Sequence, residues 1–203
     1  QNELAASYIG RDVMSWDDMV PAVRARKIEG NYGSVMQFWE DSLDGIKAQG
    51  SHPQLFLTEA YENTERRAAV YDILIGMQDR HGMNYRVAKD GSIKLIDHGF
   101  SFGSPTGWLN KSDFAEKYYG KEITQSEYNS IKKLVNWNED VNKFELKQEV
   151  IQKLRDIGFD DSKIGLLELR TQTLLESGTI KLPEAYQTQN WSRLTWRDNP
   201  TPW

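Results

Sequence analysis

The chain has 203 residues, enough for one ordinary domain with a sizeable core. Its apolar fraction of 38% and charged fraction of 27% are typical of a soluble globular protein, and the lack of cysteine excludes disulfides, thiolate metal sites and a cysteine nucleophile. The net charge of −5, with no dominant Lys/Arg cluster, argues against nucleic-acid binding, and no apolar run approaches the roughly 20 residues that span a bilayer. We therefore expect a cytoplasmic protein without a membrane span.

The first 40 residues predict a helix followed by two strands. Apolar residues recur at helical spacing near the start, at Leu4, Ala5, Tyr8 and Ile9. Residues 20–26 then alternate apolar and polar, and residues 29–33 contain the Gly and Asn of a turn. Residues 34–39 are rich in aromatic and branched side chains, as in a second strand.

The next segment predicts a connector and a buried helix. Residues 41–62 carry two glycines and a proline with few periodic apolar residues, which indicates a connector with a short helix near 43–47. Residues 64–77 then show an apolar stripe at helical spacing, formed by Ala69, Val70, Ile73, Leu74 and Met77.

The residues after this helix carry the chemistry. The stretch from Asp79 to Asn84 reads Asp-Arg-His-Gly-Met-Asn, and an Asp-Gly turn at 89–91 between two alternating runs predicts a hairpin that ends before Asp97. Because a hairpin returns its two ends to the same place, Asn84 and Asp97 should face each other across the width of one metal ion. An amide and a carboxylate oxygen suit Mg²⁺ held against phosphates. Asp79 would lie near that metal, where a base accepts a hydroxyl proton.

The motif Asp79-Arg80-His81-x-x-Asn84, followed by Asp97-His98-Gly99, resembles the catalytic loop and metal-binding strand of the phosphatidylinositol 3- and 4-kinases. Their distant relatives include atypical kinases such as the actin-fragmin and Golgi secretory kinases. The resemblance is specific over residues 64–103, faint over 1–40 and absent after about residue 110. It implies an α+β, protein-kinase-like fold: residues 1–40 as a partial small lobe of a helix and a β-hairpin, and residues 41–182 as a mainly helical large lobe with a catalytic hairpin.

The resemblance also assigns roles to the motif. Asp79 would be the catalytic base, and Asn84 and Asp97 would bind the metal and the nucleotide phosphates. Arg80 would brace the loop as an ion-pair partner. His81 would stabilise the transferring phosphoryl group or share proton handling with Asp79, or else it is a structural histidine bonded to the backbone near Asp97.

The nucleotide-binding residues expected in the small lobe rest on the same resemblance. Glu3 would pair with a phosphate-binding lysine, or it is simply a first-turn acid that the helix dipole favours. Gln37 and Phe38 would lie at the hinge beside the adenine of ATP, although core packing is the alternative for Phe38. No Gly-x-Gly-x-x-Gly occurs in the chain. We therefore expect the phosphate loop and its lysine to come from a segment upstream of Gln1 or from a partner chain. The 203-residue polypeptide would then be nearly inactive alone, with an exposed apolar edge on the strand that ends near residue 39.

The remainder predicts a loop, three helices and a tail. Residues 101–110 contain the glycines and proline of a loop. A capping box of Thr124 with Glu127 opens a helix to about residue 135, and further helices are expected from about 140 to 158 and from 160 to 178. Residues 183–203 form a tail rich in tryptophan and tyrosine, which should dock on its own domain or on a partner.

The sequence thus predicts an ATP-dependent phosphotransferase that uses Mg²⁺ or Mn²⁺ and acts on an unknown protein or small-molecule acceptor. The main alternative is a catalytically inactive, kinase-like structural or interaction subunit of a larger assembly, for example a phage particle. A third hypothesis is a kinase-like fold used for adenylyl transfer.

Overall fold

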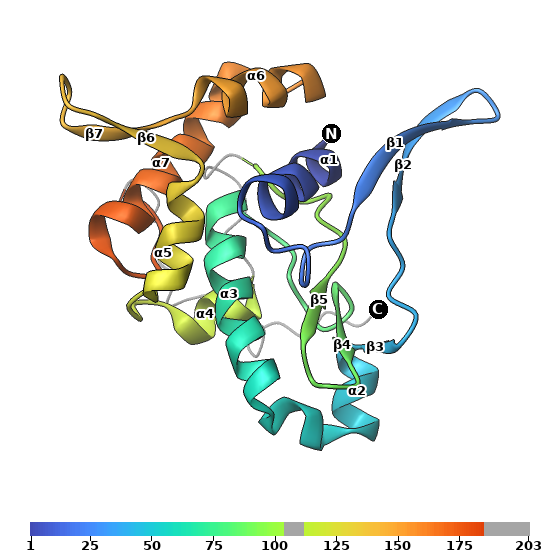
Figure 1. Cartoon of the computed structure of the whole chain (residues 1–203). Helices are drawn as coiled ribbons and strands as arrows, with labels where there is room; N and C mark the ends of the chain where they lie inside the picture. Colours follow the sequence, from blue (N-terminus) through green and yellow to red (C-terminus); the bar gives the residue numbers. More distant parts are fainter. Residues whose placement is uncertain (104–111, 185–203) are drawn as a thin grey trace.

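A computed structural model of the chain describes residues 1–103 and 112–184, and these form a mixed α+β structure with three small antiparallel sheets. Helix α3 (Glu59–Ile75) runs through the middle, with the sheet β3–β4–β5 on one side and the C-terminal helices on the other (Figure 1). This arrangement confirms the mixed class. The division into two kinase lobes stays a prediction.

Helix α3 is the central core element and the support of the motif that follows it. The Thr58 side chain caps it by accepting a hydrogen bond from the Tyr61 amide, and Gly76, with φ of 61°, ends it. Only glycine adopts this left-handed conformation without strain, so the chain leaves the helix sharply one turn before Arg80. The helix begins earlier than the apolar stripe alone predicts.

The predicted hairpin after the motif is confirmed. Strand β4 (Tyr85–Ala88) pairs with β5 (Ile93–Leu95) in antiparallel register, with Tyr85 opposite Leu95. Its inner side chains are buried, and the Ile93 amide donates to the Thr64 hydroxyl of α3 over 2.9 Å. A short strand that was not foreseen, β3 (Ser42–Asp44), pairs with the outer edge of β4.

The N-terminal region has the predicted order of a helix and two strands. Helix α1 (Asn2–Ser7) continues into a π-helix, η1 (Tyr8–Val13), and buries Ala5 and Ile9. Strands β1 (Val23–Ile28) and β2 (Asn31–Met36) form an antiparallel hairpin that projects from the body (Figure 1). The side chains of β2 are exposed along its whole length, and no other described strand pairs with it.

Short elements connect these parts. The connector after the arm contains α2 (Gly45–Ser51), capped by Asp44, and a 3₁₀-helix, η2 (Pro53–Leu57). Helix α4 (Asp113–Tyr118) begins just after the undescribed residues 104–111, on which most of the predicted loop falls.

The C-terminal part corrects one prediction. Helices α5 (Gln125–Lys132), with its capping box, and α7 (Asp161–Ser177), which ends at Gly178, agree with the sequence analysis. The helix expected from about residue 140 is wrong over its first part, because β6 (Val135–Asn138) and β7 (Lys143–Leu146) form a hairpin, and α6 (Gln148–Ile157) begins only after it.

The reason for this correction lies in side-chain alternation. Phe144 and Leu146 are buried on one face of β7, and the Phe144 ring packs edge-on against Trp137 with centroids 4.9 Å apart. A period of two residues over this segment outweighs the helical period that begins further on. The predicted aromatic tail lies outside the described residues except for 183 and 184.

Among the described helices, none is both long and apolar enough to cross a membrane.

Candidate functional site

The motif lies in a loop between the end of α3 and the start of β4, against the segment that follows β5. The Gln78 amide donates to the Phe100 carbonyl over 3.0 Å, and the Phe102 amide donates to the Ile75 carbonyl over 2.7 Å. These bonds hold the two segments side by side although they are far apart in sequence. The candidate site therefore rests on a buried helix and a short sheet, which limits its freedom to move.

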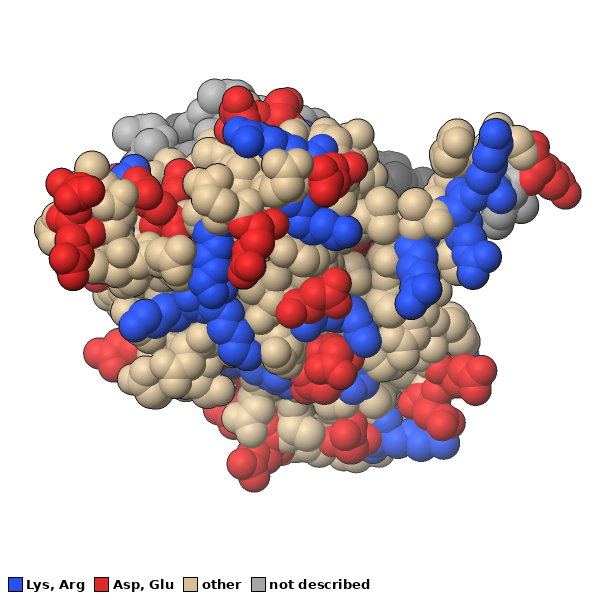
Figure 2. Space-filling model, turned by 45° about the horizontal axis from the view of Figure 1, so that its top comes forward, with Lys and Arg blue, Asp and Glu red and all other residues tan. Residues whose placement is uncertain are grey.

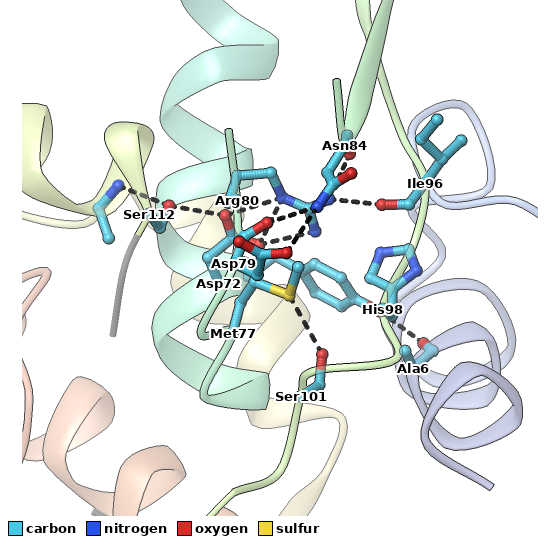
Figure 3. Close-up of polar contacts among 12 residues, drawn as sticks. Ala6, Asp72, Met77, Asp79, Arg80, Asn84, Ile96, His98, Ser101 and Ser112 are labelled. Atoms are coloured by element: carbon cyan, nitrogen blue, oxygen red, sulfur yellow. Dashed lines mark hydrogen bonds and ion pairs between the residues drawn. The ribbon is translucent and has the colours of Figure 1, made fainter. Parts of the chain in front are cut away.

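Arg80 is the buried centre of this region (Figure 3). Its Nε and Nη2 donate to the Asp72 carboxylate at 3.0–3.3 Å, and neither side chain has any exposed surface. Its Nη1 donates to the carbonyl of Asn84 at 2.5 Å and to that of Ile96 at 2.7 Å. Through these contacts Arg80 links the motif loop to helix α3 and to the residue that follows β5, and so braces the loop. A buried guanidinium with all these partners is not placed to touch a substrate phosphate.

Asp72 extends the brace to the helix after the undescribed segment. The Ser112 hydroxyl donates to Asp72 Oδ2 over 2.7 Å and accepts from the Ala115 amide, which caps α4. The Asp72 carboxylate thus joins α3, the motif and α4. Neither Asp72 nor Ser112 was selected from the sequence. Asp72 lies within the apolar stripe of the predicted helix. An acidic residue among apolar residues that are expected to be buried is the sequence signal that could have identified it.

Asn84 lies where the loop enters β4, with its side chain turned to Asp79. Its Nδ2 donates to the Asp79 carbonyl over 2.6 Å and lies 3.3 Å from the Asp79 carboxylate. Its carbonyl Oδ1 accepts no hydrogen bond from the described residues, so this oxygen is the part of the side chain left to meet a cation. The Ile96 amide donates to the Asn84 main-chain oxygen over 3.2 Å, so the hairpin does bring Asn84 beside the residue that precedes Asp97.

Asp97 is exposed and has a left-handed backbone, with φ of 55°. No hydrogen bond or ion pair links its carboxylate to another described residue. Aspartate adopts this conformation more readily than most residues, but the surrounding structure must still hold it. The residues that follow are tied to α1, because Asn2 Nδ2 donates to the carbonyls of Gly99 (2.7 Å) and Ser101 (2.9 Å).

Asp79 and His81 form a partly exposed pair. His81 Nε2 lies 3.6 Å from Asp79 Oδ1, and the two side chains are 40% and 38% exposed. His81 Nδ1 accepts from the Met83 amide at 3.3 Å, which places the proton of a neutral ring on Nε2, toward Asp79. Both side chains are therefore reachable from the solvent.

Glu3 and His98 form a second pair, between α1 and the segment after β5. Glu3 Oε2 lies 3.3 Å from His98 Nδ1, so the carboxylate predicted to pair with a lysine meets a histidine instead among the described residues. The His98 ring is fully buried, packs edge-on against Tyr71 with centroids 5.8 Å apart, and leaves its Nε2 without a partner. This burial is that of a structural histidine.

The buried His98 ring predicts a pH-dependent stability. Burial lowers the pKa of His98 below its ordinary value, and the hydrogen bond to Glu3 offsets only part of this effect. The unfolded chain, in which histidine titrates near pH 6.5, then binds a proton more readily than the folded chain. The neutral His98 ring therefore does not lower the free energy of unfolding above about pH 6.5, whereas that free energy decreases as the pH falls below this value. We expect the thermal midpoint to decrease from pH 7.5 to 5.5, and His98→Phe to flatten the decrease. His52→Gln, which alters an exposed histidine, should leave the decrease in the thermal midpoint unchanged. An unchanged slope in His98→Phe would exclude His98 as its cause.

Gln37 and Phe38 follow β2 and lead back to β3. The Gln37 amide donates to the Ala22 carbonyl over 2.8 Å, and Phe38 is 68% exposed with the Arg86 guanidinium 5.2 Å from its ring centroid. Phe38 is therefore not a core residue, and the alternative prediction of core packing is wrong for it. A pocket of about 320 Å³ adjoins this segment, lined by Phe38, Trp39, Glu40, Asp41, Ser42, Ala88 and Lys94. Its volume is at the lower end of the range for small-molecule sites.

Over the described residues, no group of three or more His, Asp or Glu side chains is placed to hold a metal ion. The protein ligands of a metal here would be Asn84 and Asp97 alone, with phosphate and water oxygens completing the coordination, as is usual for Mg²⁺.

No protein-family model matches the chain, and a search of curated proteins finds no matching relative. The kinase resemblance thus rests on the sequence motif alone.

Proposed function

We propose that the chain is an ATP- and Mg²⁺-dependent phosphotransferase of the atypical, phosphatidylinositol 3-/4-kinase-like type. The observation that carries the proposal is the position of three oxygen-bearing side chains at one end of the β4–β5 hairpin. The main-chain oxygen of Asn84 accepts from the amide of Ile96, the residue before Asp97, and the partly exposed Asp79 contacts the Asn84 side chain directly.

The donor set of Asn84 and Asp97 fits a divalent ion that is shared with the phosphates. Mg²⁺ accepts one or two protein oxygens and takes its remaining ligands from phosphate and water. Such an ion, when bound, would neutralise charge that develops on the transferring phosphoryl group. Asn84 is oriented for this role because its Nδ2 is held by Asp79, and Asp97 because the Arg80 bond to Ile96 fixes the preceding residue.

Asp79 would accept the proton of the attacking hydroxyl. The Nε2–H of His81 faces the same carboxylate and would stabilise negative charge on Asp79 or on the transferring phosphoryl group. Arg80 would act only through the backbone of Asn84 and Ile96. Phe38, which lines the 320 Å³ pocket, and its chain neighbour Gln37 would bind adenine. A glycine-rich phosphate loop is not found among the 203 residues, so we propose that its donors, and the lysine expected to face Glu3, come from another segment or a partner chain.

Removing Asp97 tests the proposal. We expect MgATP to bind the intact protein in a calorimetric titration and to bind Asp97→Ala at least about tenfold more weakly, because one of two protein ligands is lost. Asp140→Ala, which removes an exposed acid from the β6–β7 turn, is the matched control and should bind normally. Equal binding of MgATP by Asp97→Ala and the intact protein would remove Asp97 from the site.

The projecting arm of β1 and β2 favours a second candidate function, an inactive kinase-like interaction subunit. Its exposed strand suits a contact with another chain better than it suits catalysis. ATP turnover measured with the partner or assembly present separates the two functions, because an interaction subunit would bind its partner normally and show no turnover.

A further inference from the structure

The arm, defined as residues 22–37 with strands β1 and β2, has two edges of different character. Strand β1 carries three basic residues, Arg24, Arg26 and Lys27. Figure 2 shows cationic side chains along the projecting arm. Residues 31–38, which include β2, contain no charged residue and no proline. Proteins commonly protect a free strand edge with lysine, arginine or proline. The β1 edge has this protection and the β2 edge lacks it.

The register shows which backbone groups face outward from β2. The Gln37 amide donates to Ala22, so residues 22 and 37 form a hydrogen-bonded pair. Bonded and non-bonded pairs alternate in an antiparallel ladder. Since Val23 faces Met36 and the pairing continues in step, the amide and carbonyl groups of Tyr32, Ser34 and Met36 point away from β1. The β2 edge thus offers alternating donors and acceptors to a third strand.

The two faces of the arm also differ. Residues that are opposite each other in the ladder share a face. One face carries apolar side chains and places Lys27 over the Tyr32 ring, with Nζ 5.2 Å from the centroid; its residues are Val23, Ala25, Lys27, Tyr32, Ser34 and Met36. The opposite face carries Arg24 and Arg26, with the exposed Val35 opposite Arg24, and neither arginine has an ion-pair partner in residues 1–103 or 112–184.

Gly33 leaves room beside the basic face. It stands opposite Arg26, its φ is not left-handed, and a Cβ there would meet nothing within 4 Å. Neither backbone geometry nor crowding requires glycine at this position. Because Gly33 has no side chain, nothing on this face separates Arg26 from a third strand paired with the outer edge of β2. The Arg26 side chain is long enough to extend over Gly33 toward such a strand.

We propose that β2 accepts, as a third strand, an extended segment of a partner protein. That segment carries acidic side chains on the face of Arg24 and Arg26 and apolar side chains on the face of Tyr32 and Met36. Pairing of β2 with a second copy of itself would satisfy the backbone, but it would gather four arginines on one face without an acid. Nucleic acid would meet the arginines and leave the backbone edge unpaired. The inference concerns the arm alone and does not rest on phosphoryl transfer.

The probe is an end-blocked, fluorescently labelled ten-residue peptide of alternating valine and glutamate, titrated against the whole protein by anisotropy. We expect saturable binding, and at least about tenfold weaker binding of the matching valine–lysine peptide because its charges oppose the arginines. On binding of the valine–glutamate peptide, hydrogen exchange should slow at the amides of Tyr32, Ser34 and Met36.

Two variants separate the backbone contribution from the charge contribution. Ser34→Pro removes an outward amide without removing a β1–β2 bond, and should weaken peptide binding by about tenfold, whereas Ser34→Thr should not. The double change Arg24→Glu with Arg26→Glu should reverse the preference toward the valine–lysine peptide. Circular dichroism melting checks that each variant is folded.

Three results would overturn the proposal. The first is that the valine–glutamate peptide does not bind, or that it binds Ser34→Pro as tightly as it binds the intact protein. The second is a dimer in sedimentation experiments that Ser34→Pro abolishes, which would make a second copy the occupant. The third is tight binding of single-stranded DNA in place of the peptide, lost in the double arginine variant, which would make the arm a nucleic-acid contact.

Discussion

Asp79→Asn is expected to lower the rate of phosphoryl transfer by about 10²-fold or more, the usual scale for losing a positioned base. The thermal midpoint should stay within a few degrees, because the closest contact of Asp79 is made by its main-chain carbonyl, which accepts from Asn84 at 2.6 Å and survives the substitution. The side-chain contact with Asn84 is longer, at 3.3 Å. Single-turnover transfer from radiolabelled ATP, measured together with the segment or partner that supplies the phosphate loop, gives the first effect, and calorimetric melting gives the second.

The matched control for this experiment is Asp12→Asn, which changes an exposed acid outside the site and should leave the rate unaltered. The structural alternative is that Asp79 chiefly supports the loop. A large drop in the thermal midpoint with unchanged activity per folded molecule would favour that alternative and end the assignment of Asp79 as base. A His81→Gln variant adds a second readout, because the loss of the imidazole beside the Asp79 carboxylate should change the pH profile of the rate.

Local sequence signals were sufficient for most of the helices and for the hairpin that carries the site. The Asp-Gly turn, the Thr124 capping box and the glycines after α6 and α7 each act within a few residues, so their structure follows from nearby chemistry. The β6–β7 hairpin was missed because its apolar residues are few and merge into the stripe of α6. Strand β3 was missed because three residues carry almost no periodic signal.

The contacts that organise the site join residues remote in sequence, and no local pattern encodes them. The Glu3 carboxylate contacts His98, which lies 95 residues further along the chain. The Ser112 hydroxyl donates to Asp72, which lies 40 residues before it. Which acid a buried histidine or arginine meets depends on how α1, α3 and α4 pack together. The motif could therefore name Asp79, Asn84 and Asp97 as candidates, whereas the partner of Arg80 and the actual partner of Glu3 required the three-dimensional structure.

Asp72→Asn is expected to lower the free energy of unfolding by about 3–5 kcal/mol, because it leaves a buried guanidinium without its counter-charge. Asp72 and Arg80 have no exposed side-chain surface, so water cannot replace the lost carboxylate. The Ser112 hydroxyl, which donates to Asp72, would also lose an ionised acceptor. Urea unfolding at constant pH measures the change through the transition midpoint.

An exposed ion pair within the same protein provides the comparison. Arg67 and Asp18 interact at the surface, with side chains 25% and 53% exposed, and Asp18→Asn should cost no more than about 1 kcal/mol. If Arg80 acts by holding Asn84 and Ile96 in place, Asp72→Asn should also weaken MgATP binding at temperatures where the protein is still fully folded, and Asp18→Asn should not. A loss of stability in Asp72→Asn no larger than that in Asp18→Asn would show that the buried pair does not brace the site, because an unpaired charge at that position cannot be stabilised by solvent.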